Sequence, residues 1–474
     1  MGIGRLAAAA VAALALGSWV GSSHGGTTAG TAAGNAWTRF GWSPSRSSAP
    51  TFATGIGAGR VAGLHRQQVQ IAGTADSSAI YLHDVSVGGG THDVFFVTTT
   101  YGKTVAVDAA SGAVLWTFTP PGYASWAGSA QITTATPVAD PSRTAIYAAS
   151  PGGSIVKLSV ADGRALWSVS ITKLPSREKI AASLNYFGGK VIATTGGYIG
   201  DAPPYQGHVA VIGAAIGKLL HVWNSLCSNR RGVIAPASCA ASDSAIWGRA
   251  GAVVDPANGD LLVATGNGPW NGRTNWGDAV LRLDAGATRL LGNYTPANTA
   301  ELEAQDVDLG STSPVLLGGG YLAQGGKDGK IRLLSRRRMA GTRPHKGGEL
   351  STVSTPSGTD LFTAPAVLRT RSSVWLFAAD NGGTAAYRLR NAHLVVVWRN
   401  GTSGTSPVVA GGLLYVASPD GGLSVYSPFN GRRVARLTSG NGHWNSPIVV
   451  DGRIALPEGN ANDHATSGYL DIWR

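Results

Sequence analysis

Residues 106–116 read AVDAASGAVLW, and residues 157–167 repeat the pattern as KLSVADGRALW. Each copy leads from an apolar stretch through a glycine turn to a tryptophan, and Trp167 follows Trp116 by 167 − 116 = 51 residues. Weaker copies, each preceded by an apolar run, lie at Gly207 to Trp223, Asp278 to Tyr294, Gly329 to Arg338, Gly383 to Trp398, Gly422 to Leu437 and Gly468 to Trp473. A fixed period of tens of residues indicates a repeat architecture, because one unit cannot bury its hydrophobic face alone. The chain therefore contains eight units.

Each unit holds four short apolar runs separated by turn residues. In the unit at 405–437, the runs are divided by Gly411-Gly412, by residues 419–422 and by Asn430-Gly431. Short apolar runs between such turn signals are typical of antiparallel strands. The sequence thus predicts an all-β fold, an eight-bladed β-propeller of four-stranded antiparallel blades.

The two ends of the repeat region support closure of the ring. The last unit ends after Tyr469 to Trp473, one strand short of a blade, whereas the residues from Val61 to Ile71 read as an outer strand without a blade of its own. We expect this N-terminal strand to complete the last blade, because pairing both chain ends removes an exposed sheet edge. The propeller domain is predicted to span 60–474.

Composition agrees with a fold of tight turns and buried strands. The chain has 67 Gly and only 14% charged residues, against about 25% in a typical domain. Its net charge of +12 is dispersed, with short clusters only at Arg230-Arg231, Arg336 to Arg338 and Arg432-Arg433. A nucleic-acid surface would place base-stacking aromatics beside such charge, and no stripe of that kind is present in the sequence. We expect a monomer that binds no nucleic acid.

The first residues have the shape of a signal peptide. Arg5 precedes an apolar run from Leu6 to Val20, and small residues follow. A retained anchor is the alternative, but the run is shorter than the ~20 residues that a bilayer requires. The prediction is therefore a signal peptide at 1–22, an N-terminal extension at 23–59, no membrane span after signal removal, and a periplasmic, cell-surface or secreted protein.

Both cysteines, Cys227 and Cys239, fall in one long insertion between the third and fourth units. In an exported protein, two cysteines in one loop favour a disulfide over a metal site. A bridge that closes a loop of this size contributes about 3 kcal/mol.

The blade signature at 106–116 resembles that of the pyrroloquinoline-quinone (PQQ) repeat propellers. This family includes quinoprotein alcohol dehydrogenases and a non-enzymatic outer-membrane assembly propeller. The signature looks like the family's docking motif, in which a tryptophan of one blade stacks on a peptide of the next. The resemblance implies the fold, whereas activity depends on further residues.

Residues 245–335 look like the dehydrogenases' cofactor motifs, in the same order and at similar spacing. The resemblance implies that Asn267 is an amide ligand of an active-site calcium and that Asp308 is both a ligand of that ion and the catalytic base. It also implies that Lys327 lies beside the quinone oxygens and that the Trp247 ring lies under the PQQ plane. These residue types suit the chemistry, because calcium takes amide and carboxylate oxygens, an Asp can accept the alcohol proton, and a fixed ammonium stabilises charge developing on a quinone oxygen.

Other features depart from the dehydrogenase pattern. Where the family has an acidic calcium ligand in the third blade, this chain has Tyr198, and only a shifted loop would let Asp201 take that role. The adjacent-cysteine pair and the Cys-x-x-Cys-His haem motif are missing from the sequence, as are nucleotide-binding motifs. We expect no haem and no nucleotide. Each matched residue also has a local explanation, since Asn267 and Lys327 stand in glycine turns, Asp308 can cap a strand and Trp247 can pack between blades.

Two classes of function remain open. One is a PQQ- and calcium-dependent dehydrogenase of a small hydroxyl substrate. The other is a non-catalytic propeller that binds a protein, a glycan or another cell-envelope component. They differ in whether an acidic oxygen from the loop at 198–201 reaches the space between Asn267 and Asp308.

Overall fold

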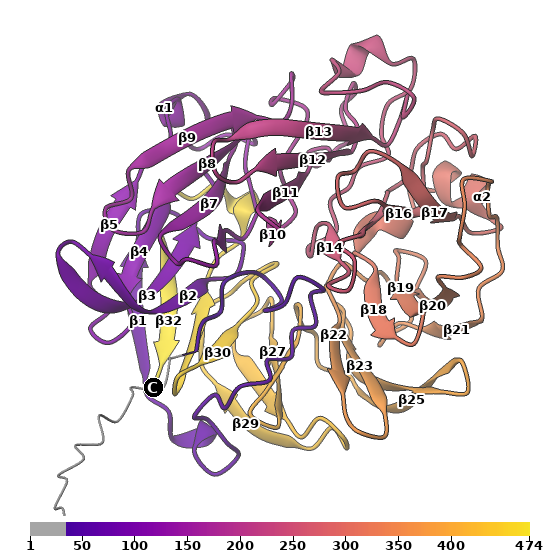
Figure 1. Ribbon diagram of the computed structural model, residues 1–474. Helices are drawn as coiled ribbons and strands as arrows, with labels where there is room; N and C mark the ends of the chain where they lie inside the picture. Colours follow the sequence, from indigo (N-terminus) through magenta and orange to yellow (C-terminus); the bar gives the residue numbers. More distant parts are fainter. Residues whose placement is uncertain (1–34) are drawn as a thin grey trace, which may run out of the picture. The chain divides into compact units, whose positions relative to one another are not determined.

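A computed structural model describes residues 35–474 of the chain, so the signal peptide predicted at 1–22 lies outside the described residues. The described part is one compact unit that contains eight four-stranded antiparallel sheets. Successive sheets follow one another around a ring (Figure 1). The predicted eight-bladed β-propeller is confirmed.

In blades 1 to 7 the four strands run in chain order from the inside of the blade to its outside. Blades 1 to 4 comprise β2 (Ile80–Val87), β3 (Gly90–Thr98), β4 (Thr104–Asp108) and β5 (Val114–Phe118); β6 (Val138–Ala139), β7 (Ala145–Ser150), β8 (Ser154–Ser159) and β9 (Ala165–Ser170); β10 (Asn185–Phe187), β11 (Lys190–Thr194), β12 (His208–Gly213) and β13 (Lys218–Asn224); β14 (Val253–Val254), β15 (Leu261–Ala264), β16 (Val280–Leu283) and β17 (Leu290–Tyr294). Blades 5 to 7 comprise β18 (Val315–Gly318), β19 (Tyr321–Gln324), β20 (Lys330–Ser335) and β21 (Ser351–Ser354); β22 (Ala366–Arg369), β23 (Val374–Ala379), β24 (Thr384–Arg390) and β25 (His393–Asn400); β26 (Val408–Ala410), β27 (Leu413–Ala417), β28 (Leu423–Tyr426) and β29 (Arg433–Leu437). Blade 8 has β30 (Ile448–Val450), β31 (Arg453–Pro457) and β32 (Gly468–Trp473), and its outermost strand is β1 (Arg66–Ile71).

Helical structure is limited to short connections. The α-helices are α1 (Tyr123–Trp126) and α2 (Thr299–Ala304), and the 3₁₀ turns are η1 (Val61–Gly63), η2 (Pro236–Ser238), η3 (Leu309–Ser311) and η4 (Ala461–Asp463). Across residues 35–474, no helix is long and apolar enough to span a membrane. Strand burial depends on position in the blade. In blade 1, the inner strand β4 is buried at every residue, whereas the outermost strand β5 is exposed or half-buried throughout.

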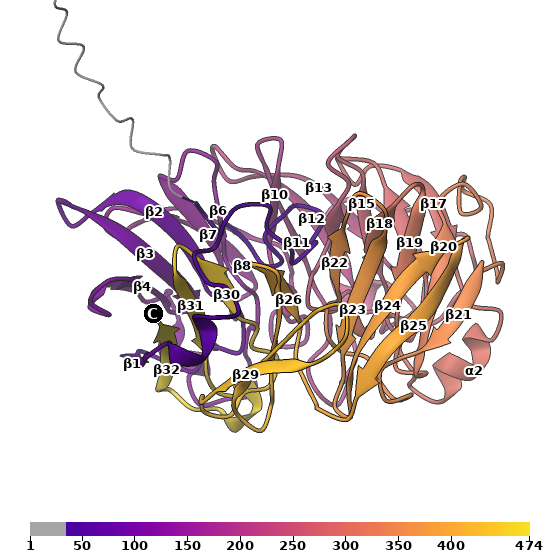
Figure 2. The same ribbon diagram turned by 90° about the horizontal axis from the view of Figure 1, so that it is seen from below.

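The ring closes as the sequence predicts. Strand β1 pairs antiparallel with β32, from Arg66 opposite Trp473 to Ile71 opposite Gly468, and the two strands lie side by side in Figure 2. The Arg66 guanidinium donates to Asp471 Oδ1 across this seam at 2.8 Å. The closing strand is shorter than expected, since residues 61–63 form η1 and the strand begins only at Arg66.

Tryptophans of the repeat signature join neighbouring blades. The indole N–H of Trp116 in blade 1 donates to the Val160 carbonyl of blade 2 at 2.9 Å. The ring lies against Gly163, where a Cβ would overlap it, so only glycine fits this turn. The equivalent bonds elsewhere run from Trp167 to the carbonyl of Ala214 (3.2 Å) and from Trp398 to that of Pro428 (2.7 Å). This contact explains why the repeat pairs a turn glycine with a tryptophan.

Residues 35–59, which the sequence analysis places in an N-terminal extension, pack into the same compact unit as the blades. Carbonyls of residues 38–48 accept hydrogen bonds from backbone N–H groups of β6, β14, β22 and β26, the innermost strands of four blades. The indigo segment of Figure 1 crosses the middle of the ring accordingly. The segment therefore satisfies inner-edge donors that the blades leave unpaired.

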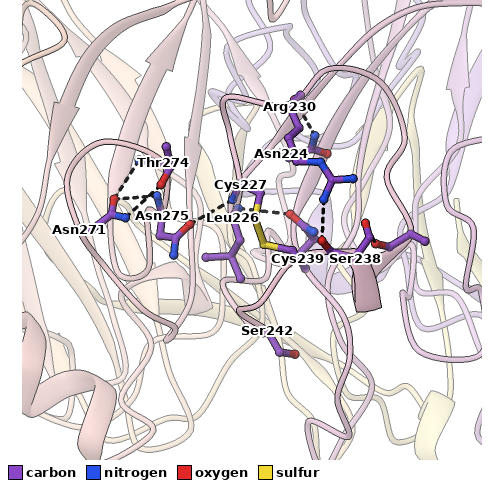
Figure 3. Close-up of a disulfide and its surroundings, with 12 residues drawn as sticks. Asn224, Leu226, Cys227, Arg230, Ser238, Cys239, Ser242, Asn271, Thr274 and Asn275 are labelled. Atoms are coloured by element: carbon purple, nitrogen blue, oxygen red, sulfur yellow. Dashed lines mark hydrogen bonds between the residues drawn. A yellow bond between two sulfur atoms is a disulfide. The ribbon is translucent and has the colours of Figure 1, made fainter.

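The disulfide predicted between Cys227 and Cys239 is present, with an S–S distance of 1.98 Å (Figure 3). It lies in the insertion between β13 and β14. The Cys227 N–H donates to the Asn275 side chain at 3.1 Å, and the Ser228 N–H donates to the Thr274 carbonyl at 2.9 Å. The bridged insertion thus supports the loop at 267–278, which carries Asn267.

Candidate functional site

One pocket of about 310 Å³ collects the residues that the sequence analysis singled out. Its lining includes all six, namely Tyr198, Asp201, Trp247, Asn267, Asp308 and Lys327. They come from the turns of three blades, at the ends of β11, β15 and β19 and ahead of β14 and β18. The structure therefore brings together residues that are up to 129 positions apart in the chain, from 198 to 327.

A second set of lining residues follows the phase of the repeat. In six blades the residue four positions before the innermost strand faces the pocket, as Asp76 does before Ile80 and Trp444 does before Ile448. The full set is Asp76, Thr134, Ala181, Arg249, Phe362 and Trp444. Sequence reasoning missed all six, although alignment of the eight units on their first strands would have marked this position.

Asp308 forms the centre of the motif-matched side. Its Oδ2 pairs with the Lys327 ammonium at 2.5 Å, and its Oδ1 accepts the backbone N–H of Asn267 at 2.6 Å. A Cβ on Gly266 would overlap Oδ1, so glycine at 266 is what allows the carboxylate to approach this loop. Lys327 also lies 3.4 Å from Asp306 Oδ1 and 5.8 Å from the Trp247 ring centre.

The electrostatics of this side are those of a carboxylate cluster around one cation. Burial disfavours the charged ammonium, but Asp308 and Asp306 outweigh that effect and raise the pKa of Lys327. Burial raises the pKa of Asp308, and the Lys327 charge opposes the shift. Burial, helped by the Asp308 charge, raises the pKa of the neighbouring Asp278 to about 8.

The donors do not fit the predicted calcium. Tyr198 donates its hydroxyl to the carbonyl oxygen of Pro175 at 2.9 Å, and Asp201 Oδ1 accepts the hydroxyl of Tyr205 at 2.8 Å. Calcium requires six to eight oxygen ligands around one point. Within residues 35–474, no group of three or more His, Cys, Asp and Glu side chains could hold a metal ion. The metal ligands expected from the sequence, Asn267, Asp308 and Asp201, line one pocket without forming a calcium cage.

An aromatic wall runs from blade 4 to blade 8. The ring centres of Trp247 and Phe362 are 5.9 Å apart, and those of Phe362 and Trp444 are 5.3 Å apart. His443 stands against Trp444 with 4.3 Å between ring centres. The planes of Trp247 and Phe362 are tilted by 39° and those of Phe362 and Trp444 by 60°, so a flat ligand would stack on one ring and meet the edges of the others.

His443 is held by a buried carboxylate. Its Nδ1 lies 2.7 Å from Asp76 Oδ2, and Asp76 also accepts the backbone N–H groups of Trp444 (2.7 Å) and Ala461 (3.1 Å). Burial opposes ionisation of Asp76, but these bonds, with the charges of His443 and Arg249, hold its pKa below the usual value. Asp76 therefore joins blade 1 to blade 8 as an anion.

Comparisons with known proteins agree with the fold. Residues 57–233 match the family model described as outer membrane protein assembly factor BamB. A search of the curated proteins finds no match.

Solved structures with the same fold include both enzymes and an assembly factor. A quinohemoprotein alcohol dehydrogenase from Comamonas testosteroni is 14% identical, with a TM-score of 0.65 over 92% of this chain and 80% of that one. A europium-containing methanol dehydrogenase is 13% identical, with a TM-score of 0.65 over 94% and 98% of the two chains. BamB from Moraxella catarrhalis is 14% identical, with a TM-score of 0.53 over 87% and 99%. The fold is that of the PQQ-repeat β-propellers, and identities this low carry the fold alone.

Proposed function

We propose that the protein is an extracytoplasmic, quinoprotein-like propeller that binds a flat quinone of the PQQ type in its axial pocket. The observation that carries the proposal is the meeting of Trp247, Asp308 and Lys327 in one pocket. The Cys227–Cys239 bridge supports an oxidising compartment. Calcium is not part of the proposal, because the donor set does not fit it.

The residues present suit such a ligand. The Trp247 ring would stack against its plane, and the Lys327 ammonium, fixed by Asp308 and Asp306, would face its carbonyl oxygens. PQQ, when bound, supplies the electron acceptor for oxidation of a hydroxyl-bearing substrate. Asp308 can take a proton from such a substrate only when Lys327 releases Oδ2, because both carboxylate oxygens are engaged in this arrangement.

The test is a binding titration of the purified protein with PQQ, followed by tryptophan fluorescence and absorbance, in EDTA and in excess calcium. We expect saturable binding that EDTA leaves unchanged. Lys327→Met and Trp247→Ala should weaken it by roughly 10- to 100-fold, about 1.4–2.8 kcal/mol. Lys330→Met, on an exposed residue of the adjacent strand β20, is the matched control.

Two results would contradict the proposal. If PQQ bound only in the presence of calcium, the site would require the metal that the donor geometry argues against. No binding under either condition would leave the non-catalytic propeller as the function. The match of residues 57–233 to an assembly-factor model favours that second candidate, with a protein, glycan or envelope component as partner.

A further inference from the structure

Two cations, Lys179 and Arg249, line the same pocket away from the Asp308–Lys327 pair. Lys179 precedes blade 3 and Arg249 precedes blade 4. Arg249 falls within the stretch at 245–335 that resembles the dehydrogenases, but neither residue is among the positions matched there to a cofactor role. The proposed function does not yet use them.

Arg249 crosses the ring and meets only neutral groups. The residue is 2% exposed, and its Nη2 donates to the carbonyl oxygens of Asp76 (2.8 Å) and Thr134 (3.3 Å), which belong to blades 1 and 2. Its Nε is buried without a hydrogen-bond partner among residues 35–474. A buried guanidinium with an unused donor is costly unless a ligand completes its bonds.

The backbone of Lys179 is fixed by hydrogen bonds, whereas its ammonium has no carboxylate partner in the described part of the chain. Its N–H and C=O bond with the Gly196 backbone at 2.7 and 2.9 Å, which sets the residue beside the Tyr198 loop. In the described part of the chain, no ion pair or hydrogen bond joins the Lys179 ammonium to a carboxylate. Its half-buried side chain faces the pocket.

The local charges do not balance. Asp76 is the one carboxylate that acts on both cations, and its oxygens already accept from His443 and from two backbone N–H groups. Lys179 and Arg249 against one anion leave at least one positive charge at this end of the pocket, whatever the charge of His443. In a largely buried site, an excess charge of this kind requires a counter-ion.

We propose that Lys179 and Arg249 form a carboxylate subsite, so that the pocket selects planar aromatic acids and holds their carboxylate at this end. The inference rests on the proposed function and adds to it the ligand's charge and orientation. Lys327, already neutralised by two carboxylates, holds the carbonyl edge. The aromatic wall connects the two ends, because the Trp247 ring centre lies 5.8 Å from the Lys327 ammonium and the Trp444 ring centre lies 5.8 Å from the Arg249 guanidinium.

The subsite should bind more weakly above pH 8. Burial lowers the pKa of Lys179 to about 8, with Arg249 adding to that effect and Asp76 opposing it. Of the other groups facing this end, Asp76 is held ionised, burial lowers the pKa of Arg249 only to about 10, and burial raises that of Tyr198. His443 faces the same space. The cationic form binds the anion, so affinity is full below pH 8 and falls by up to about tenfold per pH unit above it.

The experiment compares three probes by calorimetry at pH 7 and pH 9: PQQ, its uncharged trimethyl ester, and pyridine-2,6-dicarboxylate, an aromatic acid without a quinone. Lys179→Met should weaken the binding of both acids by roughly 10- to 100-fold at pH 7. The binding of the ester should stay unchanged. Lys179→Arg should retain binding of the acids and remove the loss at pH 9. Lys173→Met, on an exposed residue six positions earlier, should match the wild type.

The outcomes separate this inference from the function it rests on. If PQQ binds equally well to wild type and Lys179→Met, or if the ester binds as tightly as the acid, the subsite is wrong and the quinone pocket stands. If pyridine dicarboxylate binds in a Lys179-dependent manner and neither quinone binds, the quinone function is wrong and the acid subsite stands. If no probe binds, both fail. Displacement of the acids by inorganic phosphate at equal concentration would also overturn the preference for aromatic acids.

Discussion

The two sides of the pocket differ in how completely their charges are satisfied. On the side of Asp308, each carboxylate oxygen already has a partner, Lys327 on one and the Asn267 N–H on the other. On the side of Arg249, the bonds go to neutral carbonyls and a positive charge remains. The residues matched to a cofactor role, Asp308, Lys327 and Asn267, are held together by these bonds. Arg249 and Lys179, which have no such match, leave a positive charge unpaired. The motif residues mark the pocket, and the unpaired positive charge marks the end of it that can still accept an anion.

The strongest way to break this comparison is to remove one charge from each side. Asp308→Ala leaves Lys327 without its closest partner and the Asn267 N–H without an acceptor, so we expect a loss of about 3 kcal/mol in the free energy of unfolding. Lys179→Met removes an unpaired charge and should leave that free energy unchanged or raise it. Urea unfolding of both variants measures the difference. Equal losses would show that the two sides are equally satisfied.

A smaller loss of stability should follow from adding a methyl group beside Asp308 without changing any charge. Gly266→Ala places a methyl group where Asp308 Oδ1 lies, and relieving that overlap should cost about 1–3 kcal/mol. Gly57→Ala is the control, because a Cβ there meets nothing within 4 Å and its φ is not positive. Thermal unfolding of the two variants compares them. A Gly266→Ala protein as stable as the control would mean that Asp308 is free to move.

The effect that is smallest per pH unit is a difference in the pH dependence of stability. Asp278 has a folded pKa raised to about 8, so the folded state binds its proton more tightly and stability falls as pH rises from the usual Asp value towards 8. Lys179 has a folded pKa lowered to about 8, so the unfolded state binds its proton more tightly and stability rises from pH 8 towards 10.5. Each slope is at most about 1.4 kcal/mol per pH unit.

Asp278→Asn should reduce the fall in stability below pH 8, and Lys179→Met should reduce the rise in stability between pH 8 and 10.5. Unfolding midpoints measured from pH 4 to 10.5 would show both changes. Asp471 in blade 8 acts in the same direction as Asp278, so each variant is compared with the wild type. The assignment would be wrong if Asp278→Asn changed the pH dependence only above pH 8, or if Lys179→Met changed it only below pH 8.

The repeat made the fold predictable, because a glycine turn and a tryptophan recur wherever one blade contacts the next. Trp247 and Lys327 could be placed in one pocket from the resemblance to the dehydrogenases. The structure agrees, because the turn ahead of β14 and the turn after β19 lie at the same end of the ring. The orientations of Tyr198 and Asp201 could not be predicted, because each follows a hydrogen bond to a residue outside the motif, Pro175 and Tyr205. The path of residues 35–59 could not be predicted either. That segment has no sequence repeat, and its conformation depends on hydrogen bonds to the innermost strands of four blades.

The pairing of β1 with β32 sets an order of events for the chain. Strand β1 comes from residues 66–71 and its partner from residues 468–473, so blade 8 stays incomplete until residues 468–473 have been synthesised. Until then the ring is open, and β31 offers an unpaired strand edge to any neighbouring chain. A chain interrupted before residue 468 therefore differs in kind from one that is merely short, because it exposes a surface that a finished molecule never shows.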